Sequence, residues 1–250
     1  MYGIQINPNL RNLIADKRVV IIGPSPHLIG CRAGSLFDEY DIVCRVNDVI
    51  PLYELRPDYG SRTDILFHNM SHHGMPGLRE KIAHKDTRRY WENLKLVMCP
   101  SIKSIGSQSD YLQWPDNTVS AVVKNFESIN DSSVPFYWVG VKDYKKLWSA
   151  IGTEPNCGML AIMILLSYPI KELLVTGFSF FAQGVGQYDV YCEGHWPDAV
   201  PKPAAFGVGH PQEAQRRVFK DLCVSTPQLK VDSFLNEVLA INHSNVLNLK

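Results

Sequence analysis

The sequence predicts an α/β fold built on a single Rossmann-like, mostly parallel sheet flanked by helices. Short β-branched, apolar runs recur along the chain, and each ends in polar or turn-forming residues. An open parallel sheet presents ligand groups at its carboxyl edge in this way. A length of 250 residues and a hydrophobic fraction of 45% suffice for one large core without disulfides. We therefore expect one domain over residues 1–250.

The elements follow one another in order along the chain. We expect strands at residues 18–22, 41–46, 64–67, 94–98, 171–177 and 229–231. A polar helix is expected over 77–93, a buried one over 158–167, which is apolar nearly all round, and a third from Pro211. The core then occupies about 18–100 and 153–240, with a variable insertion at about 101–150, of which residues 101–134 are poorly periodic. Residues 179–209 form a long loop rich in glycine and proline, and loops of this length are usually functional or disordered.

Composition excludes several classes of protein. Lysine plus arginine equal aspartate plus glutamate, 25 against 25, so the net charge of zero argues against a nucleic-acid binder. We find no signal peptide, and the longest apolar run, residues 157–166, is shorter than the ~20 residues that a membrane span needs. The six cysteines contain no CxxC pair, so we expect reduced thiols in a cytoplasmic protein, and association with the membrane surface stays open.

Metal and hydrolase chemistry are also disfavoured. The chain has no DxD, HExxH, EF-hand or GxSxG pattern. His68, His72 and His73 cluster without a matching carboxylate or cysteine pattern. We therefore expect no metal site.

Two kinds of polar residue follow the expected strands. The turn from Gly23 through Ser25 to His27 follows the first strand, where backbone N–H groups can bind a phosphate, although its two prolines remove two donors. Asn47 and Asn69 follow the next two strands, and a carboxamide can both donate and accept, which suits a pyrimidine or a sugar. A tight turn and ordinary turn asparagines are the alternatives.

The start of the apolar helix and the long loop carry the other candidates. Asn156, Cys157 and Gly158 begin the helix, whose first N–H groups can receive a ribose, carboxylate or phosphate. The alternative is a simple N-cap by Asn156. Histidine is the commonest general base and tyrosine hydroxyls can donate to a departing phosphate, although a lone histidine is usually structural. The loop candidates are Tyr188, Tyr191, His195 and, after the loop, His210.

Taken together, these residues resemble the sialyltransferases. Residues 19–23, 37–47 and 58–63 look like the L motif of the eukaryotic-type family, and 155–162 with 175–178 look like its S motif. The run 195–198 falls where its short aromatic motif III lies, and His210 falls where its very short motif has the catalytic histidine. The small bacterial sialyltransferases are similar through 67–71, 177–188 and 209–210. The resemblance covers roughly 18–69 and 153–222.

The chain departs from the family at identifiable positions. The L- and S-motif cysteines that pair in the eukaryotic enzymes are absent, and Asn156-Cys157 replaces a pair of small hydroxyl residues. Gln215 stands where the resemblance predicts a glutamate, and Phe181 where it predicts a tyrosine. These departures leave the identity of the transferred sugar open.

The resemblance implies a GT-A-like variant of the fold with a helical or loop lid insertion. It implies an inverting, metal-independent glycosyltransferase that moves sialic acid, or a related 2-keto-3-deoxy acid sugar, from a CMP-sugar to a glycan hydroxyl. His210 would be the general base, and Tyr188, Tyr191 or His195 would bind the departing phosphate. No cofactor is expected besides the CMP-sugar, which is a substrate. The residues implied in donor binding are Gly23, Ser25, Asn47, Asn69, Asn156, Cys157, Gly158 and Phe178.

Three other functions are weighed against this one. A CMP-Kdo transferase would share the chemistry with a different sugar. A non-catalytic nucleotide- or glycan-binding module would keep the fold and CMP binding without turnover. A dinucleotide oxidoreductase is disfavoured because no GxGxxG follows the first strand. The expected partners are the CMP-sugar donor and a glycan acceptor, without nucleic acid, and the oligomeric state stays open.

Overall fold

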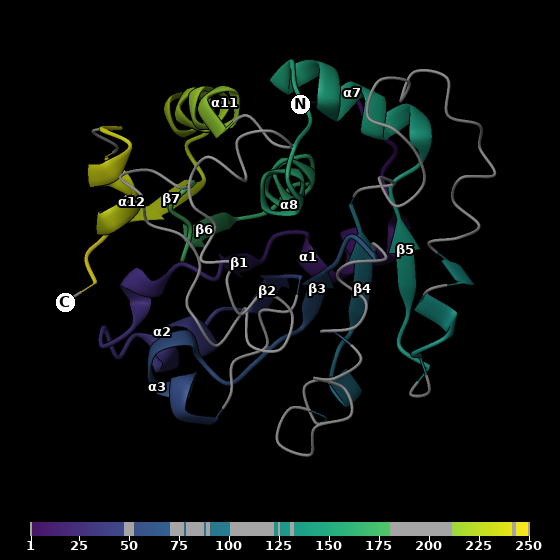
Figure 1. The fold of residues 1–250 in the computed structure, drawn as a ribbon, viewed down its shortest axis with the longest axis horizontal. Helices are drawn as coiled ribbons and strands as arrows, with labels where there is room; N and C mark the ends of the chain where they lie inside the picture. The colour runs from purple at the N-terminus through teal and green to yellow at the C-terminus, as the bar shows by residue number, and fades with distance from the viewer. Residues whose placement is uncertain are drawn as a thin grey trace, which may run out of the picture.

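The computed structural model describes residues 2–47, 53–70, 78, 88, 91–100, 123–124, 126–130, 133–180, 212–241 and 244–249. Within these residues, eight strands form one sheet in the order β5-β4-β3-β2-β1-β6-β7-β8, and every neighbouring pair is parallel (Figure 1). The expected α/β fold with a mostly parallel sheet is therefore confirmed. The strands are β1 (Arg18–Ile22), β2 (Ile42–Val46), β3 (Ile65–Phe67), β4 (Leu96–Cys99), β5 (Phe136–Trp138), β6 (Glu172–Thr176), β7 (Leu229–Asp232) and β8 (Val246–Leu247).

The direction in which the sheet grows reverses between β1 and β6. From β1 the chain adds β2, β3, β4 and β5 outward on one side, and then returns to place β6 on the other side of β1. In open α/β sheets, ligands bind in the crevice outside the carboxyl ends of the strands at such a reversal. The segments that follow β1 and β6 are therefore the first place to look for a site.

Helices cover both faces of the sheet. In Figure 1, α7, α8 and α11 lie above the sheet, and α2 and α3 lie below it. Successive residues of β1 serve the two layers in turn: Val19 and Ile21 belong to the core with α8, while Val20 and Ile22 belong to the core with α2 and α3. The helices are α1 (Pro8–Ile14), α2 (Gly34–Asp38), α3 (Arg56–Tyr59), α7 (Val141–Ile151), α8 (Cys157–Leu165), α11 (Gln212–Ser225) and α12 (Ser233–Val238), with 3₁₀ turns η1 (Pro26–Leu28) and η2 (Tyr53–Leu55).

Sequence patterns explain two of the helices that lie near the site. All nine residues of α8 are buried, as expected for a helix that is apolar on every side. α11 begins one residue after Pro211, so the helix expected there is confirmed, and it buries Gln215, Phe219, Leu222 and Cys223 at helical spacing. These two helices pack on the same face of the sheet (Figure 1).

The final third of the region 101–150, where an insertion is expected, contains a strand and most of a helix. Residues 136–138 form β5, which pairs with β4, and residues 141–151 form α7, which packs on the main core. The buried residues of α7, Val141, Tyr144, Leu147 and Ile151, recur every three or four positions, as an amphipathic helix requires. Most of the expected 77–93 helix lies outside the described residues. Leu78 and Trp91 are among the few that are described, and both are buried.

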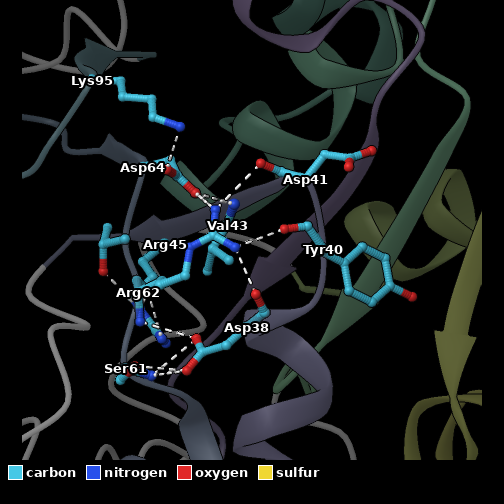
Figure 2. Close-up of polar contacts among 10 residues, drawn as sticks. Asp38, Tyr40, Asp41, Val43, Arg45, Ser61, Arg62, Asp64 and Lys95 are labelled. Atoms are coloured by element: carbon cyan, nitrogen blue, oxygen red, sulfur yellow. Dashed lines mark hydrogen bonds and ion pairs between the residues drawn. The ribbon is translucent and has the colours of Figure 1, made fainter.

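A polar network joins the amino ends of β2, β3 and β4 (Figure 2). Asp64, directly before β3, accepts hydrogen bonds from the main-chain N–H of Val43 at 2.8 Å and from the Arg62 guanidinium at 2.9 Å. The Lys95 ammonium, directly before β4, lies 2.8 Å from the other carboxylate oxygen of Asp64. This network ties the strands together at the edge opposite the reversal crevice.

Two further findings concern the whole described chain. No helix in the described segments is long and apolar enough to span a membrane. Five cysteines are among the described residues, and none of them forms a disulfide there: Cys31, Cys44, Cys99, Cys157 and Cys223.

Candidate functional site

Phe178, immediately after the end of β6, brings three segments of the carboxyl edge together. A Cβ added at Gly23, after β1, would lie 3.0 Å from the Phe178 ring and would overlap the carbonyl oxygen of Gly177. A Cβ added at Gly158, in the first turn of α8, would lie 2.6 Å from the same ring. Both positions therefore need glycine, because a side chain would overlap the Phe178 ring at Gly158 and the Gly177 carbonyl oxygen at Gly23. Three residues expected in donor binding, Gly23, Gly158 and Phe178, are thus in contact.

A second group of expected residues meets around the end of β3. The N–H of Asn47, just past β2, donates to the carbonyl of Phe67 at 2.6 Å, and the Cys157 thiol donates to the same carbonyl at 3.6 Å. Asn47 has a φ of 50°, a left-handed conformation that asparagine tolerates better than most residues. Its side-chain oxygen is buried, and no described residue donates to it.

Asn156 sits at the start of α8 and is fixed from two sides. Its side-chain oxygen accepts from the N–H of Met159 at 2.8 Å, so the predicted N-cap is present. Its own N–H donates to the side-chain oxygen of Gln215, on α11, at 3.0 Å. Gln215 is completely buried, and its amide nitrogen has no partner among the described residues. The contact joins the helix that follows His210 to the start of the apolar helix.

Asn69 and His68 continue the edge beyond β3. The Cys99 thiol, at the end of β4, donates to the carbonyl of Asn69 at 3.5 Å. His68 is fully buried, and its Nδ1 accepts from the N–H of Met70 at 3.0 Å. Asn69 thus lies on the β4 side of Asn47, as expected for residues that follow neighbouring strands.

The turn after β1 has already used its backbone donors. The N–H of Gly23 donates to the carbonyl of Thr176 at 2.9 Å, and that of Ser25 donates to the carbonyl of Gly177 at 2.8 Å. Pro24 and Pro26 have no N–H. The sequence suggested that main-chain N–H groups of this turn could bind a phosphate. In the structure, a phosphate beside Gly23 or Ser25 would find no unused main-chain donor on residues 23–26.

Asp232, which the sequence analysis did not single out, ties the ends of three strands together at the carboxyl edge. At the end of β7 it is completely buried, and one of its oxygens accepts from the Thr176 hydroxyl at 2.8 Å and the Gly177 N–H at 3.2 Å. The same oxygen lies 3.1 Å from Nε2 of His27, in the turn after β1. Burial raises the pKa of the Cys31 thiol, and the carboxylates of Asp58 and Asp232 raise it further.

Comparisons with known proteins show where this architecture recurs. No family model and no curated protein matches the sequence. The structure is similar to that of a mammalian sialyltransferase, with a TM-score of 0.50 and 16% identity, over 91% of this chain and 73% of the other. The chain has a sialyltransferase-like fold.

Two further structures with this fold are similar to the chain. One is a mammalian sialyltransferase in complex with Gal-beta-1-3GalNAc-ortho-nitrophenol, with a TM-score of 0.51 and 16% identity over 91% of this chain and 73% of the other. The other is an alpha-2,3-sialyltransferase from Campylobacter jejuni in apo form, with a TM-score of 0.48 and 14% identity over 92% of this chain and 78% of the other.

Residues 19–23, 37–47 and 58–63, which look like the L motif and are here called the L-like run, mainly hold the strands of the sheet in place. Arg45 of β2 is fully buried, and its guanidinium donates to the carbonyls of Tyr59 at 2.6 Å and Arg62 at 3.0 Å and to the Thr63 hydroxyl at 3.0 Å. Gly60 has a φ of 79°, which favours glycine. The L-like run therefore places Asn47 by holding β2 against the segment before β3.

The expected catalytic residues lie outside the described residues. These are His210, Tyr188, Tyr191 and His195. His210 precedes the first residue of α11 by two positions in the sequence. Among the described residues, no group of three or more His, Cys, Asp or Glu side chains is placed to hold a metal ion.

Proposed function

We propose that the protein is an inverting, metal-independent glycosyltransferase that moves sialic acid, or a related 2-keto-3-deoxy acid sugar, from a CMP-sugar to a glycan hydroxyl. One observation carries the proposal: residues chosen from sequence alone for donor binding meet at the carboxyl edge of a sialyltransferase-like fold. They come from β1, β2, β6 and α8, and Phe178 and the Phe67 carbonyl join them in two contacting groups. This edge, at the reversal between β1 and β6, is where open α/β sheets bind their ligands.

The polar groups at this edge match the parts of a CMP-sugar. Asn47 and Asn69 would hold the nucleotide, since carboxamides both donate and accept. The first turn of α8 would receive an anionic group of the donor, because N–H groups and the positive end of the helix dipole meet there. The buried amide nitrogen of Gln215 adds a donor beside Asn156.

The reaction itself would need one proton transfer and one displacement. His210 would take the proton from the acceptor hydroxyl while that oxygen forms a bond to the anomeric carbon of the donor sugar. The bond from the anomeric carbon to the phosphate oxygen breaks, and its electron pair leaves with CMP. Tyr188, Tyr191 or His195 would donate a hydrogen bond to the departing phosphate. Positioned general-base help of this kind contributes about 10²–10⁴-fold to a rate.

The leaving group explains why a metal ion is not needed in this proposal. CMP carries a single phosphate, whose charge a few hydrogen-bond donors can match. We propose that the reaction takes place in the cytoplasm, where cysteine thiols stay reduced.

CMP binding by the purified chain tests the proposal. We expect isothermal titration calorimetry to detect CMP binding, and Asn47→Ala to weaken it about tenfold by removing one well-placed hydrogen-bonding group. Asn12→Ala is the matched control, because Asn12 is exposed on α1. If the unaltered protein binds no CMP, the proposed function is wrong. Equal losses in both variants would remove Asn47 from the nucleotide site.

A further inference from the structure

The turn after β1 contains a chain of three hydrogen-bonded side chains that the proposed reaction does not use. The Ser25 hydroxyl lies 2.9 Å from Nδ1 of His27, and Nε2 of His27 lies 3.1 Å from Asp232. Ser25 and Asp232 are almost completely buried, with 2% and 0% of their surfaces exposed. These three side chains lie at the ends of β1 and β7, beside β6, where the order of the sheet reverses.

The partners of Asp232 fix the direction of its hydrogen bond with His27. Its carboxylate accepts from the Thr176 hydroxyl and from the main-chain N–H groups of Gly177 and Leu235. A carboxylate only accepts, so Nε2 of His27 must carry a proton toward it. In the tautomer that carries its one proton on Nε2, Nδ1 accepts a hydrogen bond from the Ser25 hydroxyl. The hydroxyl proton of Ser25 is then engaged in the hydrogen bond to His27, so toward any other group the Ser25 oxygen can only accept.

The surrounding contacts hold this arrangement in place. The His27 ring stacks on Phe234 of α12, with centroids 4.0 Å apart and planes 17° apart. The Tyr59 hydroxyl donates to the carbonyl of Ser25 at 2.7 Å. The main-chain N–H of Ser25 donates to the carbonyl of Gly177. Among the described residues, His27 is the one partner of the Ser25 hydroxyl.

Two other roles for Ser25 do not fit the turn. A nucleophilic serine needs N–H donors for the oxyanion it forms, and the residue after Ser25 is a proline. A phosphate needs donors, and the N–H groups of Gly23 and Ser25 are bonded to the carbonyls of Thr176 and Gly177. The Ser25 oxygen, whose proton is engaged by His27, offers a ligand an acceptor.

We propose that Ser25 selects the sugar of the nucleotide by accepting a hydrogen bond from a ribose hydroxyl, and that His27 and Asp232 are positioning residues for it. This inference rests on the proposed function. On a nucleotide that crosses the reversal crevice, the 2′- and 3′-hydroxyls are proton donors, whereas the ionised phosphate accepts. The turn therefore recognises the nucleoside part of the donor and makes no contribution to phosphate binding.

Titrations with four ligands test this assignment on the intact chain. The ligands are CMP, cytidine, 2′-deoxyCMP and 3′-deoxyCMP. We expect the unaltered protein to prefer CMP about tenfold over one of the two deoxynucleotides, the effect of one hydrogen bond. Ser25→Ala should abolish that preference and should weaken CMP and cytidine by the same factor. Ser35→Ala, at an exposed serine of α2, is the matched control and should change neither.

The positioning role has a separate readout. His27→Ala should also abolish the ribose preference, while affinity for the deoxynucleotide that lacks the selected hydroxyl stays unchanged. A purely structural role would weaken all four ligands alike. Equal affinity of the unaltered protein for CMP and both deoxynucleotides overturns the inference without any variant. A Ser25→Ala loss seen with CMP but not with cytidine would assign the turn to phosphate and also overturn it.

These failures differ from failure of the proposed function. If CMP does not bind the unaltered protein at all, the proposed function fails and this inference fails with it. If CMP binds but the ribose hydroxyls do not matter, the proposed function stands and Ser25 has no part in selecting the sugar.

Discussion

Replacing Gly158 by alanine tests the packing that brings the site together. In most helices this change is stabilising, by up to about 1 kcal/mol, since alanine is the better helix former. Here the new Cβ would lie 2.6 Å from the Phe178 ring, closer than non-bonded carbon atoms come. The ring cannot retreat toward Gly23, where it already fills the space of a missing side chain. Overpacking of this kind costs about 1–3 kcal/mol.

The two effects together predict a net destabilisation of about 1 kcal/mol. For a chain of this size, that lowers the melting temperature by roughly 2–4 °C. Thermal unfolding followed by circular dichroism measures it, and CMP titration should show weaker binding because the ring shifts. A melting temperature that rises on Gly158→Ala would refute the packing argument.

A second background isolates the contact. Phe178→Leu removes the ring that meets the new Cβ, so Gly158→Ala added to Phe178→Leu should be neutral or stabilising relative to Phe178→Leu alone. The difference between the two backgrounds is the coupling of the pair, expected at about 1–3 kcal/mol for residues in contact. If Gly158→Ala has the same effect in both backgrounds, Phe178 is not what excludes a side chain at position 158.

Three further predictions concern catalysis, the framework and pH. His210→Ala should lower turnover of a CMP-sugar by at least ~100-fold with CMP affinity nearly intact, and unchanged turnover would remove His210 from the role of base. Asp64→Asn should lower the free energy of unfolding by about 2 kcal/mol, since it weakens charge-assisted hydrogen bonds at the edge opposite the site; urea unfolding measures this, and a change in CMP affinity of the folded protein would contradict it. Burial raises the pKa of Glu172, but the hydrogen bonds from Lys230 and Tyr40 and the nearby positive charges outweigh it and lower the pKa below 4.5. The stability that Glu172 contributes is therefore complete above the pKa of its unfolded state and is lost as pH falls through the lower pKa of the folded state. Glu172→Gln should make the free energy of unfolding depend less on pH on the acid side. An unchanged slope would count against this prediction.

Much of the sheet could be predicted because the central strands carry strong local signals. β1 and β6 are buried on both faces, so they appear in the sequence as short β-branched runs with clear ends. β5 is three aromatic residues at the edge of the sheet, each partly exposed, with no alternation to reveal it. Its pairing with β4 depends on tertiary contact, and β8 has only two residues. Such segments cannot be told from loops by pattern alone.

The candidate site was predictable where local sequence determines position. Asn47 and Asn69 follow strands, and Asn156 begins a helix, so their places at the carboxyl edge follow from the elements themselves. The contact between His27 and Asp232 joins residues 205 positions apart, and it depends on how β7 pairs with β6 and β6 with β1. No spacing in the sequence carries that information. The sequence places His27 in the turn after the first strand, but it does not show that Asp232 is its partner.

Release of CMP from a sugar donor tests the central claim most directly. The assay would offer CMP-sialic acid and CMP-Kdo separately to the purified protein, with EDTA present and with galactose-ended and bacterial-type glycans as acceptors. We predict acceptor-dependent release of CMP from one of the two donors, and at least ~100-fold loss of that release in His210→Ala. Measurable CMP binding without release from either donor would contradict the account and would favour a binding module on the same fold.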